Sequence, residues 1–229
     1  MDVITRIHVL HRLSSGRKRA VVALPLFIFS LGLSQPVDGG KQFRPPDLVE
    51  IVKLDSSIKL DIRYATTNNF MHRKMYTQAR AFLQRPAAKA LIRANARLHT
   101  RGYGLVVLDA YRPWSVTKKF WDETPPDRRE YVANPKTGSR HNRGCAVDLT
   151  LYLLSTGGEV SMPTDYDDFS SRASPEYGGG TQEQRRARDV LRRALENEGF
   201  TVEKNEWWHF NYKGWQSYQI LNIPFAELN

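Results

Sequence analysis

The sequence predicts an α+β fold, a single domain in which a mostly antiparallel central sheet is flanked by helices. Strand-like and helix-like segments follow one another without the regular alternation that is typical of a parallel, doubly wound sheet. The 229 residues are enough for one domain preceded by a short leader. A domain of that size buries roughly 70% of the surface of its unfolded chain, so it folds without a disulfide or a structural metal. The single cysteine, Cys145, has no partner for an intramolecular disulfide.

The first half of the domain contains both kinds of hydrophobic pattern. Apolar Leu60, Ile62 and Tyr64 alternate with charged residues, as a half-buried strand requires. Pro86 stands where helices commonly begin, and Gly102 stands where one would end. Strands are therefore predicted at Val49–Ile51, Ile58–Ala65 and Leu105–Leu108, and helices at Ala87–His99 and from Trp114 to about Trp121.

The second half begins with a loop-like stretch, residues 125–143, and continues with a predicted strand at Cys145–Leu154. Residues 162–180 form a long irregular segment of the kind that often covers a site. A strongly amphipathic helix is predicted at Gln182–Glu198, where Gly199 ends it. The last predicted strand is Trp207–Tyr212.

The N-terminal residues have the pattern of a secretory signal peptide. The basic cluster Arg17–Arg19 precedes the apolar run Ala20–Leu33, which is too short to span a bilayer comfortably and is interrupted by Pro25 and Gly32. Small residues then precede a suitable cleavage site before Gln35. The alternative is an uncleaved anchor.

Three regions follow from this pattern: a signal peptide at residues 1–34, a linker at residues 35–46 and the working domain at residues 47–229. We expect the domain to be exported, either to the periplasm or to the medium, without stable membrane insertion after the leader is removed. The basic leader contributes part of the formal net charge of +10, and the other basic residues alternate with acids along helices. No Lys/Arg block interleaved with aromatics occurs, so nucleic acid is not an expected partner.

Two segments carry the residues of a catalytic metal site. The first, Ser139–Asp148, contains His141 and Asp148, and the second, Asn205–Phe210, contains Glu206 and His209. Two imidazoles and one carboxylate would be three protein ligands, with a fourth position open for water and a second carboxylate as general base. This donor set suits zinc.

The spacing of these residues assigns their roles. His141 and Asp148 are an odd number of residues apart, so an unbroken strand would point them to opposite faces, and Gly144 must supply a bend between them. Glu206 and His209 are also an odd number of residues apart, so an unbroken strand would point their side chains to opposite faces as well. If His209 lies on the strand, we expect Glu206 in the turn before it, where it would act on water and not bind the metal.

Attack on a carbonyl builds an oxyanion, which needs a cation opposite the metal. Arg112 follows a short predicted strand and is stiffened by Pro113, so it is the candidate. An equally good interpretation makes Arg112 a surface residue paired with Asp109.

Four short motifs occur in the order Tyr64–Phe70, Asp109–Pro113, Ser139–Asp148 and Glu206–His209. Together they resemble the VanX-type D-alanyl-D-alanine dipeptidases, within the wider class of zinc D-Ala-D-Ala peptidases. The resemblance extends from about Asp47 to Phe225, nearly the whole predicted domain. It implies one zinc ion per chain.

The resemblance also implies roles for single residues. His141, Asp148 and His209 would bind zinc, Glu206 would be the general base and acid, and Arg112 would stabilise the tetrahedral intermediate.

Three further residues match positions where the family holds its substrate. Tyr64 and Asp167 would hold the dipeptide, and Ser139 would help to seat its carboxylate. A carboxylate at Asp167 suits a free dipeptide, because that substrate brings an ammonium group.

The expected function is zinc-dependent hydrolysis of D-Ala-D-Ala to two D-alanines, with water on the metal attacking the peptide carbonyl, in cell-wall metabolism. One alternative is a D,D- or L,D-carboxypeptidase that acts on peptidoglycan stem peptides with the same metal site. The other is a catalytically silent binding module on a zinc scaffold. Asp167 distinguishes the first alternative, because an acylated amine has no charge for it to bind. An intact Glu206 and Arg112 argue against the second.

Overall fold

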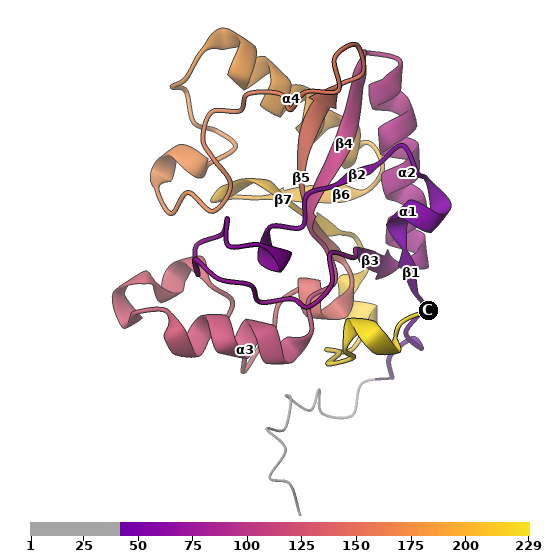
Figure 1. Ribbon diagram of the computed structural model, residues 1–229, viewed down its shortest axis with the longest axis vertical. Helices are drawn as coiled ribbons and strands as arrows, with labels where there is room; N and C mark the ends of the chain where they lie inside the picture. Colours follow the sequence, from indigo (N-terminus) through magenta and orange to yellow (C-terminus); the bar gives the residue numbers. More distant parts are fainter. Residues whose placement is uncertain (1–41) are drawn as a thin grey trace, which may run out of the picture. The chain divides into compact units, whose positions relative to one another are not determined.

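The structure is a computed structural model that describes residues 42–229 (Figure 1). The predicted signal peptide and most of the predicted linker lie outside the described residues. The central sheet has the strand order β2-β4-β5-β7-β6, in which only β2 and β4 pair in parallel. Its strands are β2 (Lys59–Leu60), β4 (Tyr103–Asp109), β5 (Ala146–Leu153), β7 (Glu206–Tyr212) and β6 (Phe200–Glu203). The prediction of an α+β fold with a mostly antiparallel sheet is confirmed.

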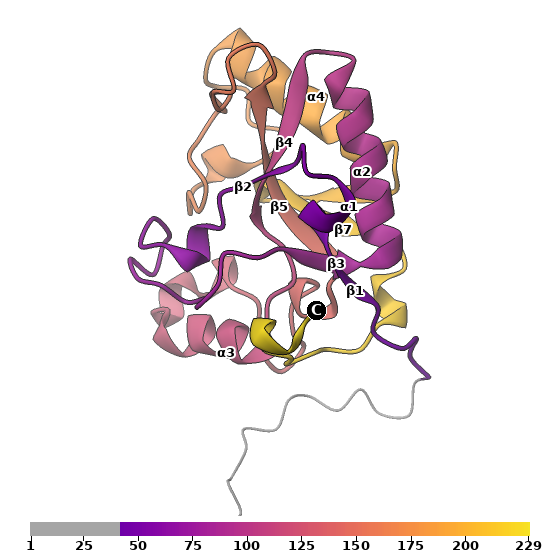
Figure 2. The same cartoon turned by 45° about the vertical axis from the view of Figure 1, so that its right-hand side comes forward.

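Two long helices cover one face of the sheet (Figures 1 and 2). They are α2 (Arg85–His99) and α4 (Gln182–Glu196), and they contact each other as well as the strands. Both were predicted, and their ends differ by no more than two residues from the expected ones. The short helix α1 (Ile51–Leu54) and the two-stranded pair of β1 (Leu48–Glu50) with β3 (Phe82–Gln84) lie beside α2.

Local sequence explains why α4 begins where it does. Thr181 and Gln184 form a capping box, in which the Thr181 side chain accepts from the Gln184 backbone N–H and the Gln184 side chain accepts from the Thr181 N–H. Such a box satisfies two N–H groups that otherwise lack partners at a helix start. The buried face of α4 includes Ala187, Leu191 and Leu195, which pack into the main core.

The predicted strand at Ile58–Ala65 is largely wrong, because only Lys59 and Leu60 pair in the sheet. The Asp61 backbone N–H still donates to Val107, but the chain then turns through a 3-10 helix at Arg63–Ala65. Ile62 and Tyr64 are buried, as their alternation indicated. A buried 3-10 turn and a buried strand edge thus produced the same hydrophobic pattern.

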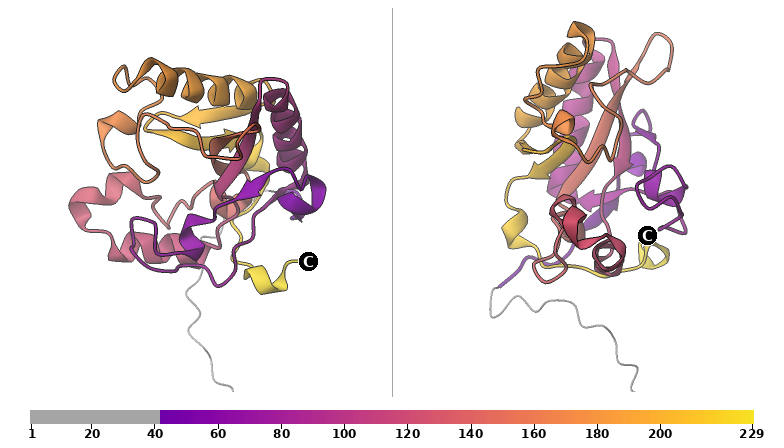
Figure 3. Two further views of the ribbon diagram at one scale, coloured as in Figure 1. Left: turned by 45° about the horizontal axis from the view of Figure 1, so that its top comes forward. Right: turned by 90° about the vertical axis from the view of Figure 1, so that its left-hand side faces the viewer.

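Smaller differences occur elsewhere. The first strand was predicted at Val49–Ile51, but Ile51 already begins α1. The strands β3 and β6 were not predicted. The helix predicted from Trp114 is α3 (Trp114–Glu123), which lies at the end of the sheet where β4 ends and β5 begins (Figure 3).

The two faces of β4 and β5 are buried by different partners. Leu105 and Val107, together with Val147, Leu149 and Leu151, belong to the main core. On the other face a small cluster of Val106, Leu108 and Tyr152 packs against Tyr166 of the irregular segment 162–180. This second face also carries Asp148, so the irregular segment covers the part of the sheet where the predicted metal site lies.

Within residues 42–229, no helix combines the length and the apolar character that a membrane span requires.

Candidate active site

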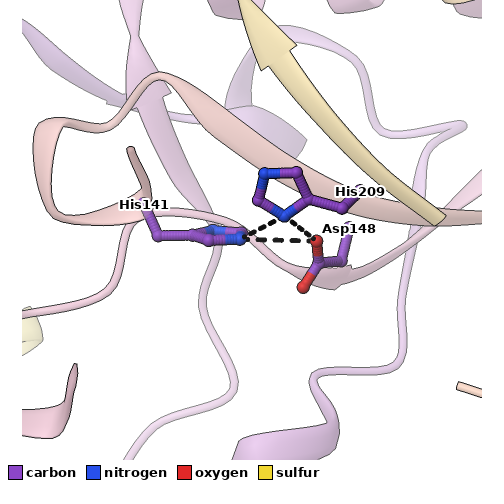
Figure 4. A group of neighbouring side chains, drawn as sticks. All are labelled: His141, Asp148 and His209. Atoms are coloured by element: carbon purple, nitrogen blue, oxygen red, sulfur yellow. Dashed lines mark hydrogen bonds and ion pairs between the residues drawn. The ribbon is translucent and has the colours of Figure 1, made fainter. Parts of the chain in front are cut away.

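The three predicted metal ligands come together (Figure 4). His141 Nε2 lies 3.1 Å from His209 Nδ1 and 3.3 Å from Asp148 Oδ1, and Asp148 Oδ1 lies 3.0 Å from His209 Nδ1. All three residues are buried. They form the only group of three or more potential metal-binding side chains among the described residues.

Backbone geometry explains the convergence. Asp148 on β5 and His209 on β7 are direct partners across the antiparallel ladder, so their side chains lie on the same face of the sheet. His141 lies in a 3-10 turn that ends at Gly144, whose φ of 64° is left-handed. The left-handed conformation favours glycine there, and a Cβ at this position would stand 2.4 Å from Leu48 Cδ2, so the Leu48 side chain would have to shift. The expected bend at Gly144 is confirmed.

Backbone and side-chain acceptors orient both imidazoles. His141 Nδ1 lies 2.6 Å from the carbonyl oxygen of Ala110, and His209 Nε2 lies 2.8 Å from Asn211 Oδ1. Each outer nitrogen donates its N–H to that oxygen, so the lone pairs of the inner nitrogens point toward Asp148. The Tyr166 hydroxyl donates to Asp148 Oδ2 at 2.8 Å and fixes the carboxylate as well. Such outer partners are typical of metal-binding histidines and carboxylates.

The three donor atoms fit a zinc ion. Asp148 Oδ1 is buried and has no hydrogen-bond partner, although it faces both imidazoles. Zinc bonds of about 2.1 Å in a tetrahedron place neighbouring donors about 3.4 Å apart, close to the 3.0–3.3 Å between these three atoms.

The charges within this group favour a cation. Burial acts to raise the pKa of Asp148, but His141 and His209 together hold it well below its usual range. Burial acts to lower the pKa of His209, yet Asp148 raises it to about 9. A metal ion would compete with a proton for His209 Nδ1, so metal binding to this group releases a proton.

Glu206 lies beside the metal-binding group without joining it. Its Oε2 is 3.6 Å from His209 Nδ1, and its side chain is half-buried. Burial raises the pKa of Glu206 to about 7, and Asp148 adds to this effect, while His209 and Arg112 oppose it. A carboxylate with such a pKa can accept and return a proton near neutrality.

The expected position of Glu206 in a turn is wrong, because it is the first residue of β7. The pairing between β6 and β7 jumps from Val202–Phe210 to Glu203–Glu206. This irregularity breaks the alternation of side chains along β7, so Glu206 and His209 reach the same side although they are three residues apart.

Arg112 lines the cavity of this site and is also paired with Asp109, as the two interpretations of the sequence expected in turn. The pair is buried, so the expected surface position is wrong. Arg112 Nε and Nη2 donate to Asp109 Oδ2 at 3.0 and 2.7 Å, and Tyr76 donates to Asp109 Oδ1 at 2.8 Å. Burial acts to lower the pKa of Arg112, but Asp109 holds it well above its usual value. Arg112 Nη1 makes no hydrogen bond to any described residue. The guanidinium also packs against the rings of Tyr64 and Phe120.

All eight residues singled out in the sequence line one cavity of about 570 Å³. They are Tyr64, Arg112, Ser139, His141, Asp148, Asp167, Glu206 and His209. Positions from 64 to 209 along the chain therefore converge on one site.

Asp167 is held in an unusual way. Its backbone φ of 61° is left-handed, a conformation that Asp tolerates better than most residues but that still costs free energy. Its carboxylate accepts from the Tyr64 hydroxyl and from the Phe70 backbone N–H, each at 3.2 Å. Burial raises the pKa of Asp167 to about 8, and the charges of Asp148 and Glu206 act in the same direction.

Ser139 is half-buried, and its Oγ accepts from the His141 backbone N–H at 3.2 Å. Its hydroxyl proton is therefore available to an acceptor in the cavity. The sequence interpretation missed Tyr166 and Asn211, which fix Asp148 and His209. Asn211 lies two residues after His209, so the strand alternation of β7 could have indicated that the two share a face.

Comparison with known proteins shows the family to which the chain belongs. The model of peptidase family M15, described as D-Ala-D-Ala dipeptidase, matches residues 44–227. A D-alanyl-D-alanine dipeptidase of Escherichia coli K12 is 29% identical to this chain over 79% of the chain and 92% of that protein. One of Enterococcus faecalis V583 is 32% identical over 74% of the chain and 89% of that protein.

Solved structures are more distant. The LD-carboxypeptidase LdcB aligns with 76% of this chain and 72% of its own, with 20% identity and a TM-score of 0.42. A likeness at that level bears on neither substrate nor residue roles.

Proposed function

The chain is a metallopeptidase of the D-Ala-D-Ala dipeptidase family, and we propose that it hydrolyses free D-Ala-D-Ala to two D-alanines with one zinc ion bound by His141, Asp148 and His209. The observation that carries this proposal is the buried Oδ1 of Asp148, which lies within 3.3 Å of a nitrogen of each imidazole inside a cavity that also contains Glu206 and Asp167. When bound, the zinc ion supplies a Lewis acid that polarises the peptide carbonyl and acidifies water.

Glu206 is the general base and acid of the proposal. Its carboxylate lies within 3.6 Å of a metal-binding nitrogen and outside the group of ligands. It takes a proton from the attacking water and returns it to the nitrogen of the departing D-alanine. The raised pKa of Glu206 supports both transfers, because a carboxyl with a pKa near 7 releases its proton as readily as it takes one.

Arg112 supplies positive charge for the oxyanion that develops at the carbonyl. Asp109 and Tyr76 fix the guanidinium from behind through Nε, Nη2 and the shared carboxylate. Nη1 is left to donate toward the cavity. A donor that is already oriented costs no reorganisation when charge develops.

The two ends of the dipeptide meet opposite chemistry. Asp167 and Tyr64 form the acceptor side, where the substrate ammonium favours the ionised form of Asp167. Ser139 donates to the substrate carboxylate at the other side, since its Oγ already accepts from the backbone. Contact with both ends would favour a dipeptide over a longer chain.

The test is D-alanine release by zinc-loaded protein from D-Ala-D-Ala and from N-acetyl-D-Ala-D-Ala. We expect release from the free dipeptide and about a 10²- to 10⁴-fold loss of kcat in Glu206→Ala, the usual range for a general acid–base. Asp167→Asn should raise KM for the free dipeptide. Efficient cleavage of the acetylated substrate by wild-type protein would instead assign a carboxypeptidase. No turnover of either substrate would assign a silent binding module.

We also propose that residues 1–34 are a signal peptide and that the domain acts outside the cytoplasm, because a basic cluster, an apolar run and small residues occur there in order. N-terminal sequencing of protein recovered from the periplasm or medium should begin at Gln35. Full-length protein that remains with the membrane would indicate the uncleaved anchor.

A further inference from the structure

Two stacked aromatic rings line the active-site cavity together with Asp167. Tyr131 and Phe169 stack with their centroids 4.9 Å apart and their planes 6° apart. Phe169 also contacts Phe70, with centroids 5.1 Å apart. Tyr131 ends the 3-10 helix Pro126–Tyr131, and Phe169 belongs to the irregular segment that carries Asp167. In Figures 1 and 3 these two segments approach each other from α3 and from the sheet, respectively.

A second cavity lies on the other side of this stack. We call it the outer cavity; its volume is about 810 Å³, and it contacts the segment after α3 and the loop around His72. It shares five lining residues with the cavity of the active site, namely Phe70, Glu130, Tyr131, Asp167 and Phe169. Side chains that line both cavities therefore separate them, and the Tyr131–Phe169 stack is among these side chains.

We propose that the Tyr131–Phe169 stack sets the length of the substrate by closing the passage from the active site to the outer cavity. The inference rests on the proposed function, in which the substrate amine lies at Asp167. Asp167 lines both cavities, so a group attached to that amine would extend toward the outer cavity and meet the stacked rings. A free ammonium ends at Asp167 and does not reach them.

The outer cavity has the size and the chemistry for a further residue. Its volume exceeds that of the active-site cavity, and its lining includes the charged residues Glu123, Asp127 and Arg128. Asp167 would not exclude an acylated amine by charge alone, because burial favours its protonated form and a neutral carboxyl can donate to a peptide carbonyl. The steric wall of the two rings then remains as the main barrier.

The test variant is Tyr131→Ala/Phe169→Ala. Both side chains are half-buried at the rim of the cavity, outside the main cluster of fully buried residues. The measured quantity is the ratio of kcat/KM for N-acetyl-D-Ala-D-Ala to kcat/KM for D-Ala-D-Ala. We expect this ratio to rise by about 10- to 100-fold over that of wild-type protein, the range for removing a steric block of this size.

Two matched variants control the experiment. Tyr131→Phe keeps both rings and should keep the selectivity ratio of wild-type protein. Trp215→Ala removes another ring that lines the same cavity, where Trp215 packs on Arg140 with 4.9 Å between guanidinium carbon and ring centroid. Trp215 does not line the outer cavity, so its loss should not raise the ratio, although it enlarges the active-site cavity.

The outcomes separate this inference from the proposed function. Wild-type turnover of D-Ala-D-Ala with an unchanged ratio in the double alanine variant would overturn the inference and leave the dipeptidase assignment standing. An equal rise in Trp215→Ala would also overturn it, because volume alone would then explain the effect. Absence of D-Ala-D-Ala turnover by wild-type protein would count against the proposed function itself.

A binding measurement decides the case in which the double alanine variant turns over neither substrate. Glu206→Ala is combined with the intact or the removed stack, and zinc-loaded protein is titrated with N-acetyl-D-Ala-D-Ala by calorimetry. Binding that is detected only without the stack supports the inference. Equal binding to both proteins, or binding to neither, overturns it.

Discussion

The buried pair of Asp109 and Arg112 allows a quantitative prediction for Asp109→Asn. This change keeps the volume but removes the negative charge beside a guanidinium; the amide oxygen can replace the acceptor for Arg112, and the amide NH2 can donate to the Tyr76 hydroxyl. Asp109 is 1% exposed and Arg112 is 8% exposed, so water could solvate the remaining cation only poorly. At 2.7 Å between Arg112 Nη2 and Asp109 Oδ2, the attraction of unit charges is about 6 kcal/mol at an effective dielectric constant of 20.

Desolvation in the native state offsets part of that attraction, and removal of one partner from a buried pair costs about 3–5 kcal/mol. We take the lower end, about 3 kcal/mol, because the amide oxygen that replaces the carboxylate can still accept from the guanidinium. For a domain of this size the corresponding fall in Tm is about 6–12 °C.

The assay is urea unfolding followed by tryptophan fluorescence, with chelator present so that metal binding does not contribute to the free energy of unfolding. The control is Asp109→Asn/Arg112→Met, which removes both charges. We expect this double variant to be more stable than Asp109→Asn, since no isolated charge remains buried. A loss below about 1 kcal/mol in Asp109→Asn, or a double variant that is no more stable, would refute the reasoning.

Three further predictions follow from the site. Asn211→Leu removes the acceptor that fixes the His209 tautomer and should weaken zinc affinity about 10- to 100-fold in a chelator competition, whereas Asn211→Asp should retain most of it. Burial raises the pKa of Asp167 in the folded protein to about 8, above its value of 3.8 when unfolded, so the folded state binds the proton more tightly and this group destabilises the protein as the pH rises toward 8. Asp167→Asn should therefore raise Tm more at pH 9 than at pH 3, both measured with chelator, and an equal change at both values would contradict the assignment. Gly144→Ala forces a side chain into a left-handed turn and against Leu48, so thermal unfolding should show a loss of about 1–3 kcal/mol, accompanied by weaker zinc binding because His141 begins that turn.

The ligands of the metal site could be predicted from the sequence because their signals are local. Gly144 marks a bend between His141 and Asp148. The odd separation of Glu206 and His209 indicated that the two residues have different roles. The predicted position of Glu206 was wrong because side chains alternate between the two faces of a strand only where the pairing is regular. The irregular pairing of β6 with β7 depends on β6, a strand that the sequence interpretation did not recognise.

The failures share a physical cause, namely contacts between residues far apart in the chain. The alternation from Leu60 to Tyr64 predicted burial correctly but not the partner, since Tyr64 turns into the active-site cavity and not onto the sheet. In the same way, Tyr131 and Phe169 lie in two irregular segments, and neither has a sequence pattern that indicates a stack. Local periodicity reports which side chains are buried, whereas the fold decides what they are buried against.

The hydrogen bond from Tyr166 to Asp148 has a thermodynamic consequence. The irregular segment that supplies this bond to a proposed metal ligand also carries Asp167 on the next residue, so in the proposed function one stretch of backbone would serve both the metal and the substrate amine. A substrate that immobilises Asp167 would also restrict the neighbouring Tyr166. Less conformational entropy of the segment would then be lost when Tyr166 orients the Asp148 carboxylate for the metal. By reciprocity, the factor by which the dipeptide tightens zinc must equal the factor by which zinc tightens the dipeptide. In the proposed function, metal retention and substrate recognition would therefore be coupled equilibria, and scarcity of either ligand would lower the occupancy of the other.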